Sequence, residues 1–155
     1  MGFSSFTGQR IKPQKKSIEA AITVSDYMAK NLITFKPDQS LIGVMEILAR
    51  HEITGGPVID QSGKLIGMIS ESDCMEQLSN SRYYNLPMGS EPVEKYMTSA
   101  VETIESHVDI FDAATKFHNS PHRRFPVVEN GKLVGQISQH DIIVAALHLK
   151  SNSWK

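Results

Sequence analysis

Two copies of a short polar motif could bind a ligand, and they are the clearest chemical signal in the sequence. Residues 67–73 and 135–141 both read Gly-x-Ile-Ser-x-x-Asp. In each copy a strand-like apolar run passes into the start of a helix, where free backbone N–H groups and the positive end of the helix dipole suit a phosphate or another anion. The serine hydroxyl could donate to that phosphate, and the aspartate carboxylate could accept from two neighbouring hydroxyls of a ribose.

The same spacing is that of a capping box, in which Ser70 with Asp73, or Ser138 with Asp141, would only satisfy the first donors of their own helix. A single occurrence would favour the cap. Two occurrences in the same context, each behind a strand glycine that lets a flat ring or a backbone approach closely, favour a ligand site.

The motifs belong to a longer internal repeat. Residues 24–61 align with residues 93–130 without a gap, Ser62 has no counterpart, and the alignment then continues to the end of both motifs. Thirteen positions are identical. Since a copy of about fifty residues buries too little surface to be stable alone, we expect the two copies to pack together as one domain.

Each copy predicts the order β-α-β-β-α, which is an α/β (α+β) fold. Residues 32–35 predict a strand, and Ser40 and Asp109 predict the caps of two helices with apolar residues at i, i+3, i+4 and i+7. Two further apolar runs predict a hairpin in each copy, most clearly where Asn130 and Gly131 separate them. A last helix should begin at each motif serine.

Composition changes along the chain suggest four segments. We expect a flexible arm at residues 1–16, a first copy at 17–79, a linker at 80–92 and a second copy at 93–150. The arm carries a small basic cluster, Lys12, Lys15 and Lys16, for which a solvated tail is the simplest interpretation and contact with RNA or a partner is the alternative.

Two apolar features lack an assigned neighbour. The linker contains Tyr83, Tyr84, Leu86 and Met88, which we expect to pack against the copies, with a partner surface as the alternative. The last helix, residues 141–149, is apolar nearly all round. Either it is wedged between the copies or its outer face meets another subunit.

Composition argues against several functions. The chain has 155 residues, 16 basic and 17 acidic, so no global field attracts nucleic acid or an anionic membrane. No apolar run approaches the roughly 20 residues needed to span a bilayer. Cys74 is the only cysteine, which excludes an internal disulfide. We therefore expect a cytoplasmic protein without nucleic-acid or membrane partners.

Catalysis and metal binding also lack the necessary residues. Gly63-Lys64 and Gly131-Lys132 do not have the other residues of a phosphate-binding P-loop, and Cys74 has no evident base. His118 and His122 have helical spacing, but Pro121 stands between them and no further ligand clusters nearby. We expect neither enzymatic activity nor a metal site.

Both copies resemble cystathionine-β-synthase-type (CBS) domains, and the chain resembles a stand-alone CBS pair, or Bateman module, of bacterial type. The resemblance covers about residues 24–149. It is carried by Met28 and Met97, by residues 37–40, 51–59 and 122–128, and by the two Gly-x-Ile-Ser-x-x-Asp endings. It implies a pseudo-twofold pair with two clefts between the copies that bind adenosine-containing ligands, a regulatory role without chemistry of its own, and a homodimer.

The resemblance also implies roles for particular residues. Asp73 and Asp141 would hold ribose hydroxyls, and Ser70 and Ser138 would face phosphate. Thr34 and Thr103, with the segments before Pro57 and Pro126, would line the adenine pockets.

The copies differ before these prolines, where the first has Thr54-Gly55 and the second has Arg123-Arg124. Arginine gives forked, charge-assisted contacts to phosphate, so we expect the second pocket to bind phosphorylated ligand better. A solvent-exposed arginine pair is the alternative.

The sequence thus predicts a sensor of AMP, ADP or ATP that needs no cofactor and acts through its dimer or through an unidentified regulated protein. Two alternatives stay open: a CBS pair that binds S-adenosylmethionine, and a protein-interaction module without a small ligand.

Overall fold

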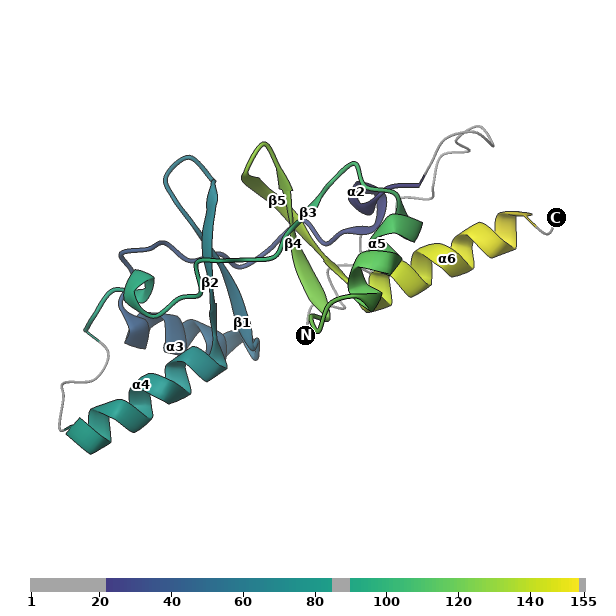
Figure 1. Ribbon diagram of the computed structural model, residues 1–155. Coiled ribbons are helices and arrows are strands. Elements are labelled where there is room, and N and C mark those ends of the chain that lie inside the picture. Colours follow the sequence, from purple (N-terminus) through teal and green to yellow (C-terminus); the bar gives the residue numbers. More distant parts are fainter. Residues whose placement is uncertain (1–21, 85–89, 154–155) are drawn as a thin grey trace. The chain divides into compact units, whose positions relative to one another are not determined.

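The structure, a computed structural model, describes residues 22–84 and 90–153 (Figure 1). The expected arm at residues 1–16, together with Leu86 and Met88, lies outside the described residues. The elements are α2 (Val24–Tyr27), α3 (Leu41–His51), β1 (Gly55–Ile59), β2 (Leu65–Ser70), α4 (Glu71–Tyr84), the 3-10 helix η1 (Val93–Lys95), β3 (Ile104–Glu105), α5 (Ile110–His118), β4 (Arg124–Glu129), β5 (Lys132–Ser138) and α6 (Gln139–Ser153). The mixed helix and strand fold predicted from the repeat is confirmed.

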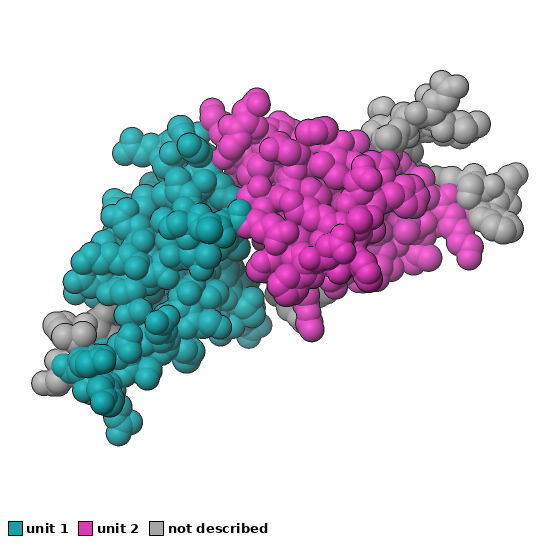
Figure 2. Space-filling model, in the orientation of Figure 1, with its two compact units in different colours: residues 1, 33–101 teal, residues 2–32, 102–155 magenta. Residues whose placement is uncertain are grey.

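The chain forms two compact units that do not coincide with the two copies (Figure 2). Of the described residues, unit 1 contains 33–84 and 90–101, and unit 2 contains 22–32 and 102–153. Each unit therefore contains the hairpin of one copy with the two helices that flank it, and the leading segment of the other copy. The leading segments are residues 22–32, in unit 2, and residues 90–101, in unit 1. The sequence repeat alone did not predict this exchange.

Backbone pairing holds each exchanged segment on a hairpin. In unit 1, Met68 and Thr98 exchange two N–H···O hydrogen bonds of 2.9 and 2.8 Å. In unit 2, Ala29 and Gln136 do the same at 2.9 Å in both directions. Each leading segment thus adds a short edge pairing to β2 or to β5.

The motif glycines make room for these segments. A Cβ on Gly67 would collide with the sulfur of Met97, and a Cβ on Gly135 would lie 2.7 Å from both the sulfur of Met28 and the carbonyl oxygen of Ala29. The two repeated features, a methionine in each leading segment and a glycine in each hairpin, are therefore packing partners. In unit 2 the close backbone approach expected at this glycine is made by the protein's own chain.

The predicted helix caps are confirmed in both copies. The side chain of Ser40 accepts from the N–H of Gly43 at 3.2 Å, and that of Asp109 accepts from the N–H of Phe111 at 2.7 Å. The apolar stripe behind each cap is buried in its unit. These caps and stripes explain why the helices start where they do.

Both predicted hairpins form, and β1–β2 and β4–β5 are antiparallel pairs. Asn130 and Gly131 have φ of 51° and 79°, which are the values that a tight type I′ turn requires. The strand expected at residues 32–35 is reduced to one parallel bridge between Phe35 and Val58. Its counterpart in the second copy, β3, pairs with β4 over two residues.

Two apolar features of the sequence are exposed. Tyr83 and Tyr84 end α4 with 82% and 63% of their surface exposed, so the prediction that they pack against the copies is wrong for this pair. Helix α6 buries Ile142 and Ala145 but exposes Ile143 and Leu147, so it is not buried on all sides. No helix in the described ranges is long and apolar enough to cross a membrane.

Candidate functional site

In unit 2 the strand register brings a cation to the start of helix α6. Arg124, the first residue of β4, pairs with Ser138, the last residue of β5. The carbonyl of Arg123 accepts from the N–H of Gln139, the first residue of α6, at 3.1 Å. The arginine pair at the start of β4 therefore lies directly beside the Ser-x-x-Asp motif.

Asp141 is buried at this helix start, with 8% of its surface exposed. Its Oδ2 accepts from the N–H of Ser138 at 2.8 Å, and its own N–H donates to Ser138 Oγ at 3.1 Å. Burial raises the pKa of Asp141, while the hydrogen bonds from Ser138 and the charges of His140 and Arg124 oppose that rise. The charge of Arg124 therefore acts on this carboxylate.

A third cation in unit 2 was not predicted. Lys116 on α5 donates to the carbonyl of Thr103, and its Nζ lies 5.3 Å from the ring centroid of Phe125, the residue after Arg124. The copy alignment holds a signal that could have identified it, because its counterpart in the first copy is the apolar Ile47.

Unit 1 has the same backbone arrangement without the cations. Gly55 pairs with Ser70 as Arg124 does with Ser138, and the carbonyl of Thr54 accepts from the N–H of Glu71 at 2.9 Å. A Cβ on Gly55 would lie 2.6 Å from the carbonyl oxygen of Ile69, so this position has no room for a side chain.

Both Ser-x-x-Asp motifs form the capping boxes that were the alternative interpretation. In unit 1, Asp73 Oδ2 accepts from the N–H and the hydroxyl of Ser70, at 2.8 and 3.0 Å, and the Asp73 N–H donates to Ser70 Oγ at 3.3 Å. In the described part of the chain, the hydrogen bonds accepted by the two carboxylates end on Oδ2. One oxygen of each therefore remains to accept from a ligand.

The residues expected to line adenine pockets lie on or next to β1 and β4, the strands that lead from the starts of α4 and α6. Pro57 and Pro126 are buried in β1 and β4. The N–H of Phe35, next to Thr34, donates to the carbonyl of Pro57 at 2.9 Å. In unit 2, Ile104, next to Thr103, pairs with Val127.

The predicted site residues thus form two groups, one in each unit. The unit 1 group is Thr34, Thr54, Pro57, Ser70 and Asp73, and the unit 2 group is Thr103, Arg123, Arg124, Pro126, Ser138 and Asp141. A cavity of about 390 Å³ opens in unit 1 between α3 and α4, and of these residues only Thr54 lines it.

His122, one of the two histidines considered as metal ligands, lies beside a carboxylate. His122 Nε2 lies 3.5 Å from Glu102 Oε2, which also accepts from the hydroxyl of Ser120 at 3.1 Å. Residues 22–84 and 90–153 contain no group of three or more His, Cys, Asp or Glu that could hold a metal ion.

The repeat, its hairpins and its paired motifs define one family. The CBS domain family model matches residues 24–80 and 93–148. The chain therefore belongs to the CBS domain family and contains two CBS repeats.

Relatives include stand-alone proteins of this family. The chain is 30% identical to the chloroplastic CBS domain-containing protein CBSX1 of Arabidopsis thaliana, over 95% of this chain and 74% of that protein. A crystal structure of CBSX2 in complex with AMP is 31% identical and has a TM-score of 0.70, covering 83% of this chain and 98% of that one. The CBS domain pair of protein MJ0100, in complex with 5'-methylthioadenosine and S-adenosyl-L-methionine, is 26% identical with a TM-score of 0.62, covering 84% and 99%.

Proposed function

We propose that this protein is a regulatory module that binds an adenine nucleotide, AMP, ADP or ATP, at the start of helix α6 in unit 2. The observation that carries the proposal is the register of β4 and β5, which pairs Arg124 with Ser138, the residue whose N–H donates to the buried carboxylate of Asp141. A cation can bind a phosphate and a carboxylate can accept from sugar hydroxyls, so the two together suit a ligand that contains both a phosphate and a sugar. The AMP complex of CBSX2 and the adenosine ligands of MJ0100 support this ligand class.

Each of the side chains at the start of α6 has a separate role in this proposal. The oxygen of Asp141 that the cap leaves open accepts from ribose hydroxyls, since its Oδ2 is used by Ser138. Arg124 and Arg123 are exposed and meet the phosphate with forked, charge-assisted hydrogen bonds. The segments around Thr103 and Pro126 contact the base.

The charges favour a nucleotide over S-adenosylmethionine. The sulfonium of S-adenosylmethionine is a cation, and unit 2 presents Arg123, Arg124 and Lys116 near its group of site residues. The cation-free group in unit 1, with Gly55 in place of Arg124, is less selective against an uncharged adenosine ligand.

The proposed role is regulation without turnover. Binding energy alone would alter the stability of the protein, its self-association or its contact with a regulated protein, and the serine and aspartate of each motif are engaged in capping their helix. Steady hydrolysis of ATP by the purified protein would contradict this part of the proposal.

A thermal-shift panel tests the ligand class directly. AMP, ADP, ATP and S-adenosylmethionine are each titrated against the full-length protein, and we expect a rise in melting temperature with at least one phosphorylated ligand. At 100 times its dissociation constant such a ligand adds about 2.7 kcal/mol to the free energy of unfolding. A shift with S-adenosylmethionine alone supports the alternative ligand, and no shift with any of the four supports a protein-interaction module.

A further inference from the structure

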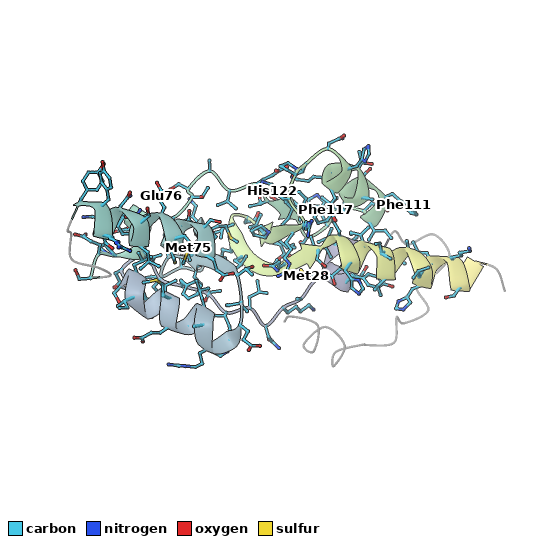
Figure 3. The ribbon with its side chains drawn as sticks, turned by 90° about the horizontal axis from the view of Figure 1, so that it is seen from below. Met28, Met75, Glu76, Phe111, Phe117 and His122 are labelled. Atoms are coloured by element: carbon cyan, nitrogen blue, oxygen red, sulfur yellow. The ribbon has the colours of Figure 1, made fainter. Side chains whose placement is uncertain are left out.

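The cavity between α3 and α4 is a groove with an apolar floor and an acidic rim. Met45, Leu48 and Ile53 line it from α3 and the residues that follow, and Cys74 and Met75 line it from α4. Figure 3 shows Met75 on the side of α4 that faces α3. The lining also includes two carboxylates, Glu52 and Glu71, together with Ala49 and Thr54.

The rim supplies negative charge that no cation of the described chain neutralises. The ion pairs among residues 22–84 and 90–153 join Lys95 to Glu91 and His122 to Glu102, and neither includes Glu52 or Glu71. Burial, with the charges of Asp73 and Glu71, raises the pKa of Cys74, so the thiol on the floor stays neutral. The groove therefore suits an apolar group flanked by cations.

The N-terminal segment of the same chain has this chemistry. Residues 1–16 contain Arg10, Lys12, Lys15 and Lys16 and no acidic residue, a net charge of +4. Residues 33–101, the range of unit 1, contain five Lys and Arg against nine Asp and Glu, a net charge of −4. The two opposite charges are equal in size.

One tripeptide of the segment matches the groove most closely. In Arg10-Ile11-Lys12 a single branched apolar side chain stands between two cations, and Pro13 favours an extended backbone at the residue before it. In an extended backbone the side chain of Ile11 points to one side, and its long cationic neighbours can bend back to a rim.

We propose that the groove between α3 and α4 binds the chain's own N-terminal segment, with Ile11 on the apolar floor and Arg10 and Lys12 at Glu52 and Glu71. The residues that line the groove belong to unit 1, whereas the proposed nucleotide site at the start of α6 belongs to unit 2. The two proposals therefore depend on different residues.

Length favours the segment of the same molecule over that of a second copy. Ile11 lies eleven residues before Ile22, the first described residue, and an extended chain of that length spans up to about 37 Å. Tethering also gives an effective concentration on the order of millimolar, which exceeds the concentration of separate molecules in a dilute sample.

A spin label on the segment tests the contact. The label is attached at Thr7→Cys in full-length protein that carries Cys74→Ala, and the methionine methyl signals are recorded by NMR. We expect paramagnetic broadening of Met45 and Met75 and little change at Met28 and Met97, which pack against the strand glycines. In a second sample, spin-labelled chains without isotopes are mixed with isotope-labelled chains that carry no spin label, and only the latter are observed. The broadening should then disappear.

Charge reversal provides matched variants. Arg10→Glu with Lys12→Glu should lower the ratio of docked to free segment about two- to tenfold, because exposed ion pairs are individually weak. Lys15→Glu with Lys16→Glu changes the net charge equally and should have the smaller effect. Glu52→Gln with Glu71→Gln should act like the first pair, whereas Glu46→Gln with Glu76→Gln, on the same helices outside the lining, should not.

Three results would overturn the proposal: unchanged Met45 and Met75 signals, broadening that persists in the mixed sample, or equal effects of the two charge-reversal pairs. Since Cys74→Ala could disturb the groove, the same variants are also compared without the label in the Cys74 protein, through the methyl chemical shifts of Met45 and Met75. Nucleotide binding should be unaffected by the rim variants, so loss of this contact and failure of the nucleotide proposal are distinguishable.

Discussion

Arg124 and Gly55 occupy the same place in two nearly identical backbones, and this single difference separates the two groups of site residues. Each pairs with a motif serine at the start of a helix. Only unit 2 has a guanidinium at this place, and its charge opposes the rise in the pKa of Asp141. At the scale of single residues, the proposed preference for phosphorylated ligands depends on this arginine.

Replacing Arg124 with alanine should weaken AMP binding by about 1.5–3 kcal/mol, because a charge-assisted hydrogen bond to phosphate is lost. Isothermal titration calorimetry measures the change. Adenosine, which has no phosphate, is the control and should bind both proteins equally. Unchanged AMP affinity would remove Arg124 from the site.

The buried carboxylate of Asp141 predicts a pH dependence. Because its pKa is raised above the ordinary value of 3.8, Asp141 takes up a proton at a higher pH than an exposed aspartate does, and the neutral carboxyl is a poorer acceptor for two ribose hydroxyls. Adenosine affinity should be constant near neutral pH and fall as the pH drops through the raised pKa. Asp141→Asn should bind more weakly and show no such fall.

The raised pKa of Asp141 also determines the direction in which the free energy of unfolding changes with pH. A carboxyl whose pKa is raised in the folded state holds its proton longer there than in the unfolded chain, so its contribution to the free energy of unfolding decreases as the pH rises from about 3.8 through the raised pKa. The difference between wild type and Asp141→Asn in urea titrations across that range would show it. An increase with pH would contradict the burial of Asp141.

At this scale the sequence predicted residue types better than their contacts. The paired motifs and the arginine difference were visible, because the two copies can be compared position by position. Lys116 was missed because its hydrogen bond to Thr103 spans 13 residues and has no local pattern. The capping bonds of both motifs are local, and the spacing had indicated them as the alternative.

Among the elements, the two motif glycines differ in what stands against them. At Gly67 the nearest atoms belong to the flexible side chain of Met97, whereas at Gly135 the carbonyl oxygen of Ala29 lies 2.7 Å from the position of a Cβ. A side chain can move aside, but a hydrogen-bonded backbone resists displacement.

Gly135→Ala should therefore lower the free energy of unfolding by about 2–3 kcal/mol, in the range for overpacking, and Gly67→Ala by about 1 kcal/mol or less. Urea denaturation of the two variants, side by side, measures the difference. Equal losses would show that the backbone of Ala29 is not held against β5.

Helices and hairpins were predictable because their signals are local: a capping residue, an apolar stripe, an Asn-Gly turn. The exchange of leading segments was not, since Met28 and Gly135 are 107 positions apart and the repeat would look the same if each segment packed on its own copy. The short strand at Phe35 was overestimated because β propensity does not specify how many partners a strand finds.

For the whole molecule, the exposed apolar face of unit 2 predicts self-association. Phe111, Ile143 and Leu147 have 65%, 57% and 59% of their surface exposed on α5 and α6, and Figure 3 shows Phe111 on α5. Ile143 and Leu147 are four residues apart in α6 and so lie on one side of the helix, and exposed apolar side chains that lie together are typical of an interface. We propose that a second copy covers this face.

Ile143→Lys with Leu147→Lys should change the unfolding free energy of the monomer by no more than about 1 kcal/mol, since surface substitutions have small effects. In sedimentation velocity, wild type should run as a dimer and the double variant as a monomer. Asn80→Lys with Arg82→Ala, on the exposed end of α4, should leave the dimer intact. A monomeric wild type would refute the interface.

The reciprocal packing of the leading segments makes damage appear at a distance. A truncation that removes residues 22–32 would delete α2 and spare every other helix and strand of the first copy, yet it would remove from the hairpin of the second copy its edge pairing and the methionine that covers Gly135. Neither copy can be excised as a complete folding unit, because the leading segment of the other copy supplies an edge pairing to its hairpin and the methionine that packs on its motif glycine.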